Sequence, residues 1–458
     1  MTTNAPEPAV KAPSVVSAGP VDSWVASLAS KGRMLLYRLQ CWLLCHMGPF
    51  KLLFGLLRRV RPLTLLGSTL WVSKADDVRE VLGRFDDFTL AQVIEPGMPW
   101  GQFIMTIDWH EQHALERGLL QSAVDPVADI QKIRAIAAGE CRAQAGASTT
   151  PGRLDVVARL AEPVAVRIAA HYFGVAPLNG SAARMADAMA DLAGMIMVNP
   201  PVDSVPWASS RASTAGLTNQ VLTQIADRKA AVTGGTPGLP DDLMTRLVRK
   251  LCAGNQPAWF NDDWIRRYLT GLVATGGATI VRATAHAVDQ LLAHPDGLRQ
   301  AQAVARDLDR NPDDSNLIAQ LRQLIYEALR FRPMLPLLVR DCPRDTVIAA
   351  GTARERIVPG GTRVITAPLS AMFDTDKVEA PDQFRAGRPP ETYLLFGYGD
   401  RSCFGRYIAD NAILEIVRFV LLLPGLTRAA GADGQVGYGG PAARSLVVTY
   451  RGGMGAAA

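Results

Sequence analysis

A helical period dominates this 458-residue chain. In seven stretches apolar residues recur at spacings of three and four, which places them on one face of a helix. The stretches are 125–145, 153–172, 182–197, 214–231, 241–252, 261–294 and 297–306. Asp241-Asp242 and Asn261-Asp262-Asp263 stand at the start of two of them, as helix caps and first-turn acids do. The chain is therefore predicted to be mostly helical.

Strand-like segments are few and short. They lie at 63–72, 346–349, 364–367 and 446–450. Stretches rich in proline, glycine or small residues predict loops at 199–215, 233–240 and 373–393. The sequence contains no internal repeat and no linker between two independent cores. We expect one large, mostly α domain with small β-sheets.

The N-terminal region differs from the rest of the chain. Residues 1–30 begin with a run of Ala, Pro, Val and Ser, and we expect a disordered tail there. Residues 31–62 mix basic and large apolar side chains, but their longest uncharged run, 39–50, is shorter than the roughly 20 residues that span a bilayer. This amphipathic segment is predicted either to pack on the domain formed by 63–458 or to lie at a membrane surface.

Composition narrows the class of protein. With 48% hydrophobic and 20% charged residues, the chain has the balance of a soluble globular protein. Its net charge of +5 comes without a dense Lys/Arg run, so no nucleic-acid partner is expected. No signal-peptide pattern leads the chain, and six scattered cysteines without a CxxC pair favour a reducing compartment. We expect a cytoplasmic protein, with the membrane alternative at the inner face.

One cysteine stands in a distinctive context. Cys403 follows the glycine-rich run 396–402 and precedes Phe404-Gly405 and an apolar helix over 406–423. Glycines let a backbone approach a flat macrocycle closely. Loop N–H groups and the N-terminus of the following helix are expected to lower the pKa of the thiol, and so to favour the thiolate as a metal ligand. The alternative is a buried free cysteine ahead of a helix.

This segment reads Phe396-Gly-x-Gly-x-Arg401-x-Cys403-x-Gly. It resembles the haem-binding signature of the cytochrome P450 family, bacterial type, at every defined position. The resemblance implies a single large helical fold around a buried haem b (iron protoporphyrin IX). It makes Cys403 the axial ligand of the iron, places Phe396 among the cofactor-binding residues, and pairs Arg401 with a haem propionate.

Two further motifs carry the resemblance. Glu327 and Arg330 match the family's Glu-x-x-Arg, and their spacing puts both on one helix face, so we expect them to hold the fold. Arg340 stands where the family has a propionate-binding arginine; the alternative is an ordinary arginine at a strand edge. Both motifs precede Cys403 in the order that the family shows.

Earlier in the chain, His113 and Arg117 resemble the family's His-x-x-x-Arg. A spacing of four places both side chains on one helix face, where they can bind a propionate together. His110 lies nearby and is an alternative to His113.

The central helix departs from the family pattern. The family shows an acid before a threonine there, whereas this chain reads Ala274-Thr275-Gly276-Gly277-Ala278-Thr279. Proton transfer by a positioned side chain contributes about 10²–10⁴ in rate. Without the acid, either oxygen activation is slower or the protons reach the oxygen by a different route. Thr275, Thr279 and water, with room left by the two glycines, are the predicted route. Arg282 either binds a substrate carboxylate or faces away from the haem.

The resemblance implies a monooxygenase that inserts one oxygen atom from O2 into a hydrophobic small molecule such as a lipid, terpenoid or aromatic. No flavin- or iron–sulfur-type cysteine pattern is present, so electrons come from a ferredoxin or flavodoxin with an NAD(P)H-dependent reductase. Arg401, Arg406 and Arg418 are expected to steer that partner. The alternatives are a peroxide-dependent or hydroperoxide-rearranging enzyme, and a non-catalytic haem-binding protein. We expect a monomer.

The substrate pocket is predicted only by analogy with the family's distal cavity. The candidates are apolar residues before the His-x-x-x-Arg motif, in the central helix and after the Glu-x-x-Arg motif. They are Phe103, Ile104, Leu272, Val273, Leu335 and Leu337.

Overall fold

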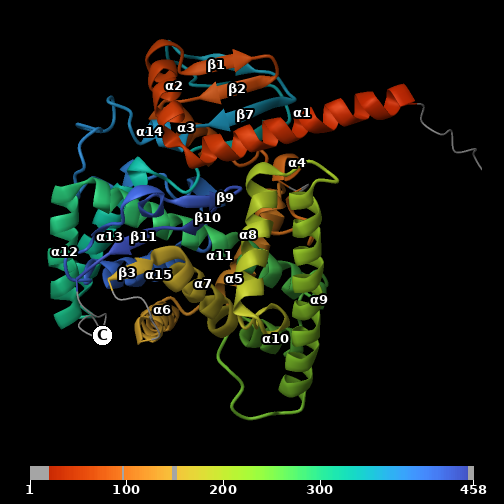
Figure 1. Cartoon of the computed structure of the whole chain (residues 1–458). Coiled ribbons are helices and arrows are strands. Elements are labelled where there is room, and N and C mark those ends of the chain that lie inside the picture. Colours follow the sequence, from red (N-terminus) through yellow and green to blue (C-terminus); the bar gives the residue numbers. More distant parts are fainter. Residues whose placement is uncertain (1–19, 95–96, 147–151, 452–458) are drawn as a thin grey trace, which may run out of the picture.

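The computed structural model describes residues 20–94, 97–146 and 152–451. A body of helices makes up most of the molecule, and a small sheet with its own short helices lies at one end (Figure 1). The α-helices are α1 (Pro20–Cys45), α2 (Met47–Val60), α3 (Ala75–Gly83), α4 (Ala91–Ile94), α5 (His110–Gln121), α6 (Ala128–Gly146), α7 (Glu162–Ile168), α8 (Ala182–Val198), α9 (Val205–Thr233), α10 (Leu243–Cys252), α11 (Asp262–Ala293), α12 (Pro295–Arg310), α13 (Ser315–Phe331), α14 (Pro368–Ala371) and α15 (Arg406–Leu421). This confirms the prediction of a mostly α fold with small sheets.

The strands form small sheets. The largest has the order β1-β2-β7-β4, in which β2 and β7 run parallel and the other pairs antiparallel. The strands are β1 (Leu63–Leu66), β2 (Thr69–Val72), β3 (Arg153–Asp155), β4 (Leu338–Cys342), β5 (Thr346–Ile348), β6 (Arg356–Val358), β7 (Thr362–Thr366), β8 (Thr427–Arg428), β9 (Gly437–Gly439), β10 (Ala442–Ser445) and β11 (Val447–Thr449). The sheet joins segments far apart in the sequence, so the N-terminal strands share one hydrophobic core with residues 331–394.

Helix α11 is the centre of the helical body. It packs against α8, α9, α13 and α15, and most of its residues are buried. A helix that is apolar on all sides belongs in the interior of a large domain. Its start is fixed by Asn261, whose side-chain oxygen accepts a hydrogen bond from the Trp264 N–H at 3.0 Å. The acids predicted to cap this helix therefore stand at its first turn.

Some predicted boundaries were wrong. The segment 199–215 is a loop only as far as Ser204, because α9 begins at Val205. The Ser204 hydroxyl accepts from the Trp207 N–H at 3.3 Å, and Pro206 stands in the first turn, where a proline is tolerated. Residues 63–72 form a hairpin, not one strand, because Gly67 turns the chain with φ +59°. Residues 153–172 begin with β3, and π-helical turns at Val157–Ala161 and Ala169–Phe173 flank α7.

The N-terminal segment is helical. Helix α1 starts at Pro20, so residues 20–30 are not the disordered tail that we expected, and residues 1–19 lie outside the described residues. The C-terminal end of α1 is bound to the body by two arginines. Arg282 donates to the carbonyls of Leu44 and Pro441, and Arg332 donates to the carbonyl of Cys45 at 3.1 Å. Arg282 is fully buried in this contact and faces the N-terminal helix, which excludes its binding a substrate carboxylate.

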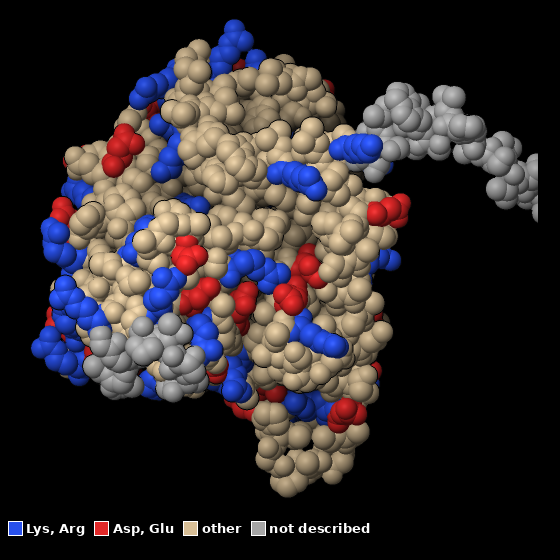
Figure 2. All heavy atoms as spheres, viewed as in Figure 1, with Lys and Arg blue, Asp and Glu red and all other residues tan. Residues whose placement is uncertain are grey.

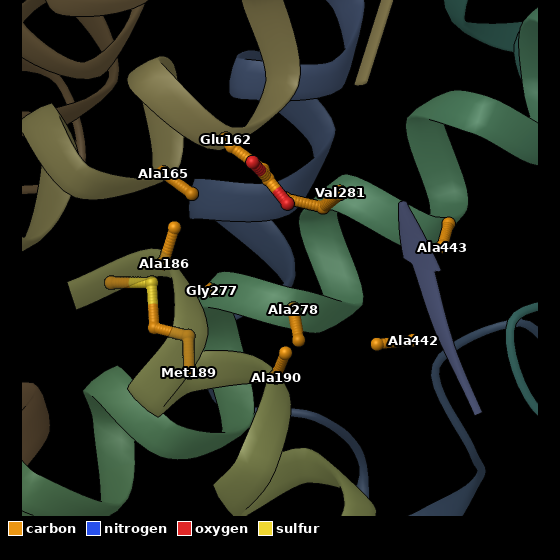
Figure 3. A pocket seen from close by; sticks show the side chains of 10 residues that line it. All are labelled: Glu162, Ala165, Ala186, Met189, Ala190, Gly277, Ala278, Val281, Ala442 and Ala443. Atoms are coloured by element: carbon orange, nitrogen blue, oxygen red, sulfur yellow. The ribbon is translucent and has the colours of Figure 1, made fainter. Parts of the chain in front are cut away.

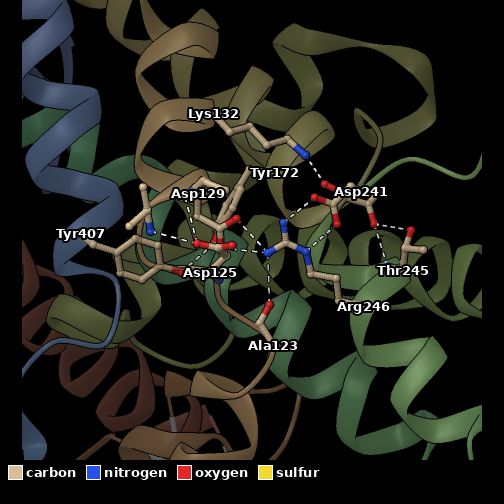
Figure 4. A network of polar contacts seen from close by, with 12 residues as sticks. Ala123, Asp125, Asp129, Lys132, Tyr172, Asp241, Thr245, Arg246 and Tyr407 are labelled. Carbon is tan, nitrogen blue, oxygen red and sulfur yellow. Dashed lines mark hydrogen bonds and ion pairs between the residues drawn. The ribbon is translucent and has the colours of Figure 1, made fainter. Parts of the chain in front are cut away.

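A buried polar network fixes the start of α15 (Figure 4). The Tyr172 hydroxyl donates to the Asp129 carboxylate at 2.7 Å and lies 2.8 Å from the hydroxyl of Tyr407. Arg246 bridges two acids, donating to Asp129 at 2.8 Å and to Asp241 at 2.6 Å. Because Tyr407 lies in the first turn of α15, the network ties that turn to α6, α10 and the residues after α7. Buried polar groups of this kind stabilise a single arrangement only when all are satisfied.

Lys51 in α2 provides a test of how the N-terminal segment is packed. Its ammonium lies 5.0 Å from the ring centre of Phe331 and 4.9 Å from that of Phe373. Burial, with a smaller contribution from Arg330, lowers the pKa of Lys51 to about 8 from 10.5. The unfolded chain therefore binds more protons between these two pH values. The buried charge of Lys51 therefore lowers the free energy of unfolding by its full amount below pH 8. This loss becomes smaller as the pH rises toward 10.5.

We expect Lys51→Met to raise the free energy of unfolding at pH 7 by about 1–3 kcal/mol, because it removes a buried cation that has no carboxylate in contact. The variant should also lose the gain in stability between pH 8 and pH 10. Urea unfolding followed by circular dichroism measures both effects, with the exposed Lys31→Met as control. A loss of stability in Lys51→Met at pH 7 would contradict this account.

Candidate functional site

The loop before α15 presents the Cys403 thiol. Gly397 and Gly399 have φ of +75° and +71°, a region that favours glycine, and a Cβ on Gly399 would lie 3.0 Å from the Cα of Gly83. The Cys403 N–H donates to the Phe396 carbonyl at 2.9 Å and closes the loop. Cys403 is exposed, whereas Cys41, Cys45, Cys141 and Cys342 are buried. The alternative of a buried structural cysteine at 403 is therefore wrong.

The surroundings of the sulfur change the pKa of the Cys403 thiol in two opposing directions. Desolvation by the protein around it is the larger effect and raises the pKa of Cys403, although the side chain is accessible. The Gly405 N–H and the charge of Arg117 lower it, as expected of the loop and a neighbouring cation. The net shift of the pKa of the free thiol is upward because desolvation outweighs both, although the contribution of the loop has the predicted direction. Binding a metal removes the proton of a coordinating thiol, so the ligand role is unaffected.

A basic cluster of Arg401, Arg340, Arg117 and His113 lies near this loop. Arg401 is almost completely buried, donates to the Asp108 carboxylate at 2.7 Å and stacks its guanidinium 3.7 Å from the ring centre of Phe85. Arg340 is 5% exposed, and burial together with Arg401 lowers its pKa to about 10. Two arginines of the cluster, Arg401 and Arg340, thus lie near a single carboxylate, Asp108.

The histidine of the cluster is His113. It is buried 4.9 Å from the ring centre of Phe85, and burial, Arg401 and Arg117 lower its pKa to about 4. His110, the alternative, is half exposed and lies 3.2 Å from the carboxylate of Asp400 at the surface. His113 and not His110 is therefore the member of the pair that lies inside with Arg117.

The basic cluster fits an anionic group. Two buried nitrogens of Arg401, Nε and Nη1, have no hydrogen-bond partner among the described residues. Buried N–H groups almost always have an acceptor, and a guanidinium suits a carboxylate. An excess of cations with unsatisfied donors beside an exposed thiol matches a flat metal-bearing macrocycle with carboxylate side chains. The residues present fit a haem.

One face of α11 carries the two threonines. Thr275, Gly276 and Thr279 are partly exposed, whereas their neighbours on the helix are buried. The Thr279 hydroxyl donates to the carbonyls of Thr275 at 2.6 Å and Gly276 at 3.0 Å, and the Thr275 hydroxyl donates to Gly271 at 2.7 Å. Both oxygens keep lone pairs that can accept from water.

The two glycines of this helix have different roles. A Cβ on Gly276 would meet nothing within 4 Å, so this residue leaves room on the threonine face, as predicted. A Cβ on Gly277 would lie 2.3 Å from the sulfur of Met189 in α8. Gly277 therefore permits close packing of α8 on α11, and it also lines a small cavity beside Met189.

The structure separates the candidates for the substrate pocket. Val273 is fully buried in the main core, and Phe103 packs on Tyr268 and on Gly271. Ile104 and Leu272 are buried at 5% exposure each. Leu335 and Leu337 are partly exposed in the segment between α13 and β4. The two leucines are the candidates that a ligand can reach directly in this conformation.

Glu327 and Arg330 form a fully buried ion pair. Two nitrogens of Arg330 donate to the carboxylate at 2.8 and 2.9 Å, and Arg388 donates to the same carboxylate at 3.1 Å. Arg330 also donates to the carbonyls of Met372 at 3.1 Å and Pro381 at 2.7 Å. These contacts bind α13 to the irregular segment before the cysteine loop, which is the structural role expected.

Sequence reasoning missed two residues near the site. Asp108 receives Arg401 and the N–H groups of Leu90 and Ala91 at the start of α4, and its place before the His-x-x-x-Arg motif was the only signal. Phe85 lies against Arg401 and His113, and nothing in the local sequence marks it.

Comparisons with known proteins agree with this site. A family model described as cytochrome P450 matches residues 217–422. The chain is 28% identical over 368 residues to erythromycin C-12 hydroxylase of Saccharopolyspora erythraea, covering 78% of this chain and 82% of that one. It is 27% identical over 342 residues to a steroid C26-monooxygenase of Mycolicibacterium smegmatis, covering 74% and 75%. The solved structure of ligand-free CYP164A2 from Mycobacterium smegmatis superposes with a TM-score of 0.71 at 22% identity, covering 91% and 99%.

The fold and the cysteine loop define a haem-thiolate protein. The chain is similar to bacterial-type cytochrome P450s, among them a named hydroxylase and a named monooxygenase, which are oxidoreductases.

Arg401 offers a test of the basic cluster. We expect Arg401→Gln to release haem about 10- to 100-fold faster, because a charge-assisted hydrogen bond to a carboxylate contributes about 1.5–3 kcal/mol. Transfer of haem to excess apomyoglobin measures the rate. Arg406→Gln is the matched control, since Arg406 begins α15 near the same loop but is exposed to solvent. Equal release rates in the two variants would rule out a role for Arg401 in binding the propionates.

Proposed function

We propose that this protein uses O2 and two electrons to insert one oxygen atom into an apolar small molecule, with Cys403 as the ligand of haem b. The observation that carries the proposal is the exposed Cys403 thiol beside a basic cluster with unsatisfied buried donors. When bound, haem supplies the iron at which oxygen is activated, and thiolate ligation favours cleavage of the O–O bond.

The chain's own residues divide the remaining work. Arg401, Arg340, Arg117 and His113 hold the propionates and so fix the plane of the cofactor. Phe396 lies next to the thiolate in sequence and accepts the hydrogen bond of the Cys403 N–H. Thr275 and Thr279 bind water on the oxygen side and move protons through their hydroxyls. Leu335 and Leu337, with Phe103, Ile104 and Leu272 behind them, make the surface for the substrate.

The substrate proposal is a large apolar molecule. The candidate residues are all hydrocarbon or aromatic, so the substrate gains mostly from removing apolar surface from water. The two relatives named above are an erythromycin C-12 hydroxylase and a steroid C26-monooxygenase. We propose the same class for this chain, with lipids and terpenoids as its smaller members.

A second function is favoured by one observation, Ala278. An enzyme whose substrate is a peroxide or a lipid hydroperoxide does not have to activate O2, because the substrate already contains the O–O bond. Such an enzyme needs no acid at this position to deliver protons. Such an enzyme would rearrange or use peroxide without electrons. A haem protein without turnover is the third possibility, and the retained Thr279 argues against it.

Oxygen labelling separates these functions. With ferredoxin, its reductase, NAD(P)H and labelled O2, we expect one labelled oxygen atom in a product from a panel of a steroid, a macrolide, a fatty acid and a terpene. The same ferric protein without reductant should leave a fatty-acid hydroperoxide intact. Mass spectrometry reads both. Rapid rearrangement of the hydroperoxide without reductant would replace the monooxygenase proposal, and no change in either reaction would favour a binding protein.

Only part of the predicted docking surface for an electron partner is compatible with the structure. Arg401 is buried, and Arg418 is 13% exposed and paired with Glu415 and Asp309, so neither can steer a partner as predicted. Arg406 is 55% exposed and lies three residues after Cys403. We propose that a ferredoxin or flavodoxin, reduced by an NAD(P)H-dependent reductase, docks over Arg406, and that the enzyme acts as a monomer.

We further propose that the N-terminal helices rest on the inner face of an anionic membrane. The described residues contain no helix long and apolar enough to cross one. Residues 31–62 instead carry seven Lys or Arg and no acid. In α1, Leu35, Leu36, Leu39 and Trp42 are each 49–70% exposed and share one face. In Figure 2 the surface over α1 is uncharged between basic side chains.

Helix α2 adds a second apolar face. Leu52, Leu53, Leu56 and Val60 are 47–80% exposed, at a helical spacing like that of α1. Contiguous exposed apolar patches with basic rims mark membrane-contact sites. The remainder of the protein would stay in the cytoplasm.

Vesicle binding tests this face. We expect the wild-type protein to sediment with vesicles of phosphatidylserine and phosphatidylcholine, less so at high salt, and Leu36→Asp/Leu39→Asp to lose most of the binding. Leu222→Asp, at an exposed leucine of α9, is the matched control and should bind like wild type. Equal sedimentation of both variants, or none of the wild-type protein, would rule the membrane contact out.

A further inference from the structure

A small cavity lies beside the residue at which the family's acid is missing. It has a volume of about 10 Å³ and is lined by Ala278 of α11, by Glu162 of α7 and by apolar side chains of α8 and β10. A space of this size is about the least that holds one water molecule. In Figure 3 the Glu162 side chain leaves α7 and points toward α11, near Val281, one turn of helix from Ala278. A carboxyl group is thus present at this cavity, supplied by a different helix.

Glu162 is partly exposed to solvent and is paired with an arginine. Its Oε1 lies 3.5 Å from Nη1 of Arg444, and the same nitrogen donates to Asp187 at 3.1 Å. The three side chains are 23%, 35% and 68% exposed, in the order from the cavity outward. Because the Glu162 side chain is itself 23% exposed, a proton lost there can be replaced from bulk water without passing through the guanidinium of Arg444.

The environment of Glu162 favours its holding a proton. Burial raises the pKa of this carboxyl, and the charges of Asp187 and Asp155 add to the effect. Arg444 opposes it through its charge and its hydrogen bond, and the net direction is upward. A carboxyl whose pKa moves toward the working pH is better suited to pass protons than a surface glutamate.

The cavity meets α11 at Ala278, the residue before Thr279. Consecutive residues on an α-helix point about 100° apart because there are about 3.6 residues per turn, so the cavity and the Thr279 hydroxyl lie on adjacent faces of the helix. Gly276 and Gly277 place no side chain between these two faces.

We propose that Glu162 supplies the protons for oxygen activation that the family draws from the acid before the threonine. The path runs from solvent to the Glu162 carboxyl, then through water in the cavity to the hydroxyl of Thr279. The overall reaction is RH + O2 + 2 H⁺ + 2 e⁻ → ROH + H2O. Both protons pass Glu162 and are replaced from solvent, while both electrons come from the reduced ferredoxin or flavodoxin. The inference rests on the proposed monooxygenase function.

The direct variant is Glu162→Gln, which keeps the shape of the side chain and cannot donate a carboxyl proton. We expect substrate-dependent oxygenation to fall about 100-fold, more NAD(P)H to be lost to peroxide, and the solvent isotope effect on kcat to rise. Substrate binding, read from the haem absorption spectrum, should be unchanged. Glu379→Gln is the matched control, since it removes a carboxyl that pairs with an arginine, Arg385, at an exposed position outside the cavity, and it should behave nearly like wild type.

A second variant distinguishes proton supply from a structural role. Adding Ala278→Asp to Glu162→Gln returns a carboxyl to the same cavity from α11, and we expect it to restore most of the oxygenation. Infrared spectroscopy gives a readout without turnover: a protonated carboxyl band should titrate in the wild type and be missing in Glu162→Gln but present in Glu379→Gln.

The outcomes separate this inference from the proposed function. If the wild type oxygenates with reductant while Glu162→Gln keeps the same rate and solvent isotope effect, only the role of Glu162 is overturned. If Glu162→Gln is slow but Ala278→Asp restores nothing and the infrared band persists, its role is structural and the inference is again overturned. If the wild type shows no reductant-driven oxygenation, both the function and the inference are overturned.

Discussion

The buried charges of Glu327, Arg330 and Arg388 set the position of the chain that leads into the cysteine loop. That chain, residues 373–393, is nearly without regular structure, so its backbone carbonyls need partners from elsewhere. Arg330 and Arg388 supply them, donating to carbonyls between Met372 and Gln383, and Glu327 is paired with both arginines. Burying three charges is costly unless each is paired and hydrogen-bonded, and here they are. The irregular segment is thus held as firmly as a helix.

The cysteine loop is held from both ends. Glu327 and its arginines hold the entry, and the Asp129–Tyr172–Tyr407 network holds the first turn of α15 after it. Between these two anchors the glycines turn the backbone, and the thiol remains accessible. In the basic cluster, Arg401 keeps two buried nitrogens without partners among the described residues. These two donors stand where the proposed anionic cofactor would bind.

How much of this arrangement could be predicted depends on how far apart in the sequence the interacting residues lie. The cysteine loop, the Glu327–Arg330 pair and the long central helix follow from local spacing, and all three lie where local spacing put them. The early start of α9 was missed because small residues and prolines read as a loop until Ser204 is seen to cap a helix. Long-range partners were not predictable in this way. Nothing near Arg282 indicates the end of α1, and nothing near Ala278 indicates Glu162.

The central claim is that Cys403, and no other cysteine, binds the haem iron through its sulfur. X-ray absorption at the iron edge of the purified ferric protein tests this most directly. The account predicts a sulfur neighbour of iron in the wild type and in Cys141→Ser, and its loss in Cys403→Ser. A sulfur neighbour that persists in Cys403→Ser, or that is missing from the wild type, would contradict it.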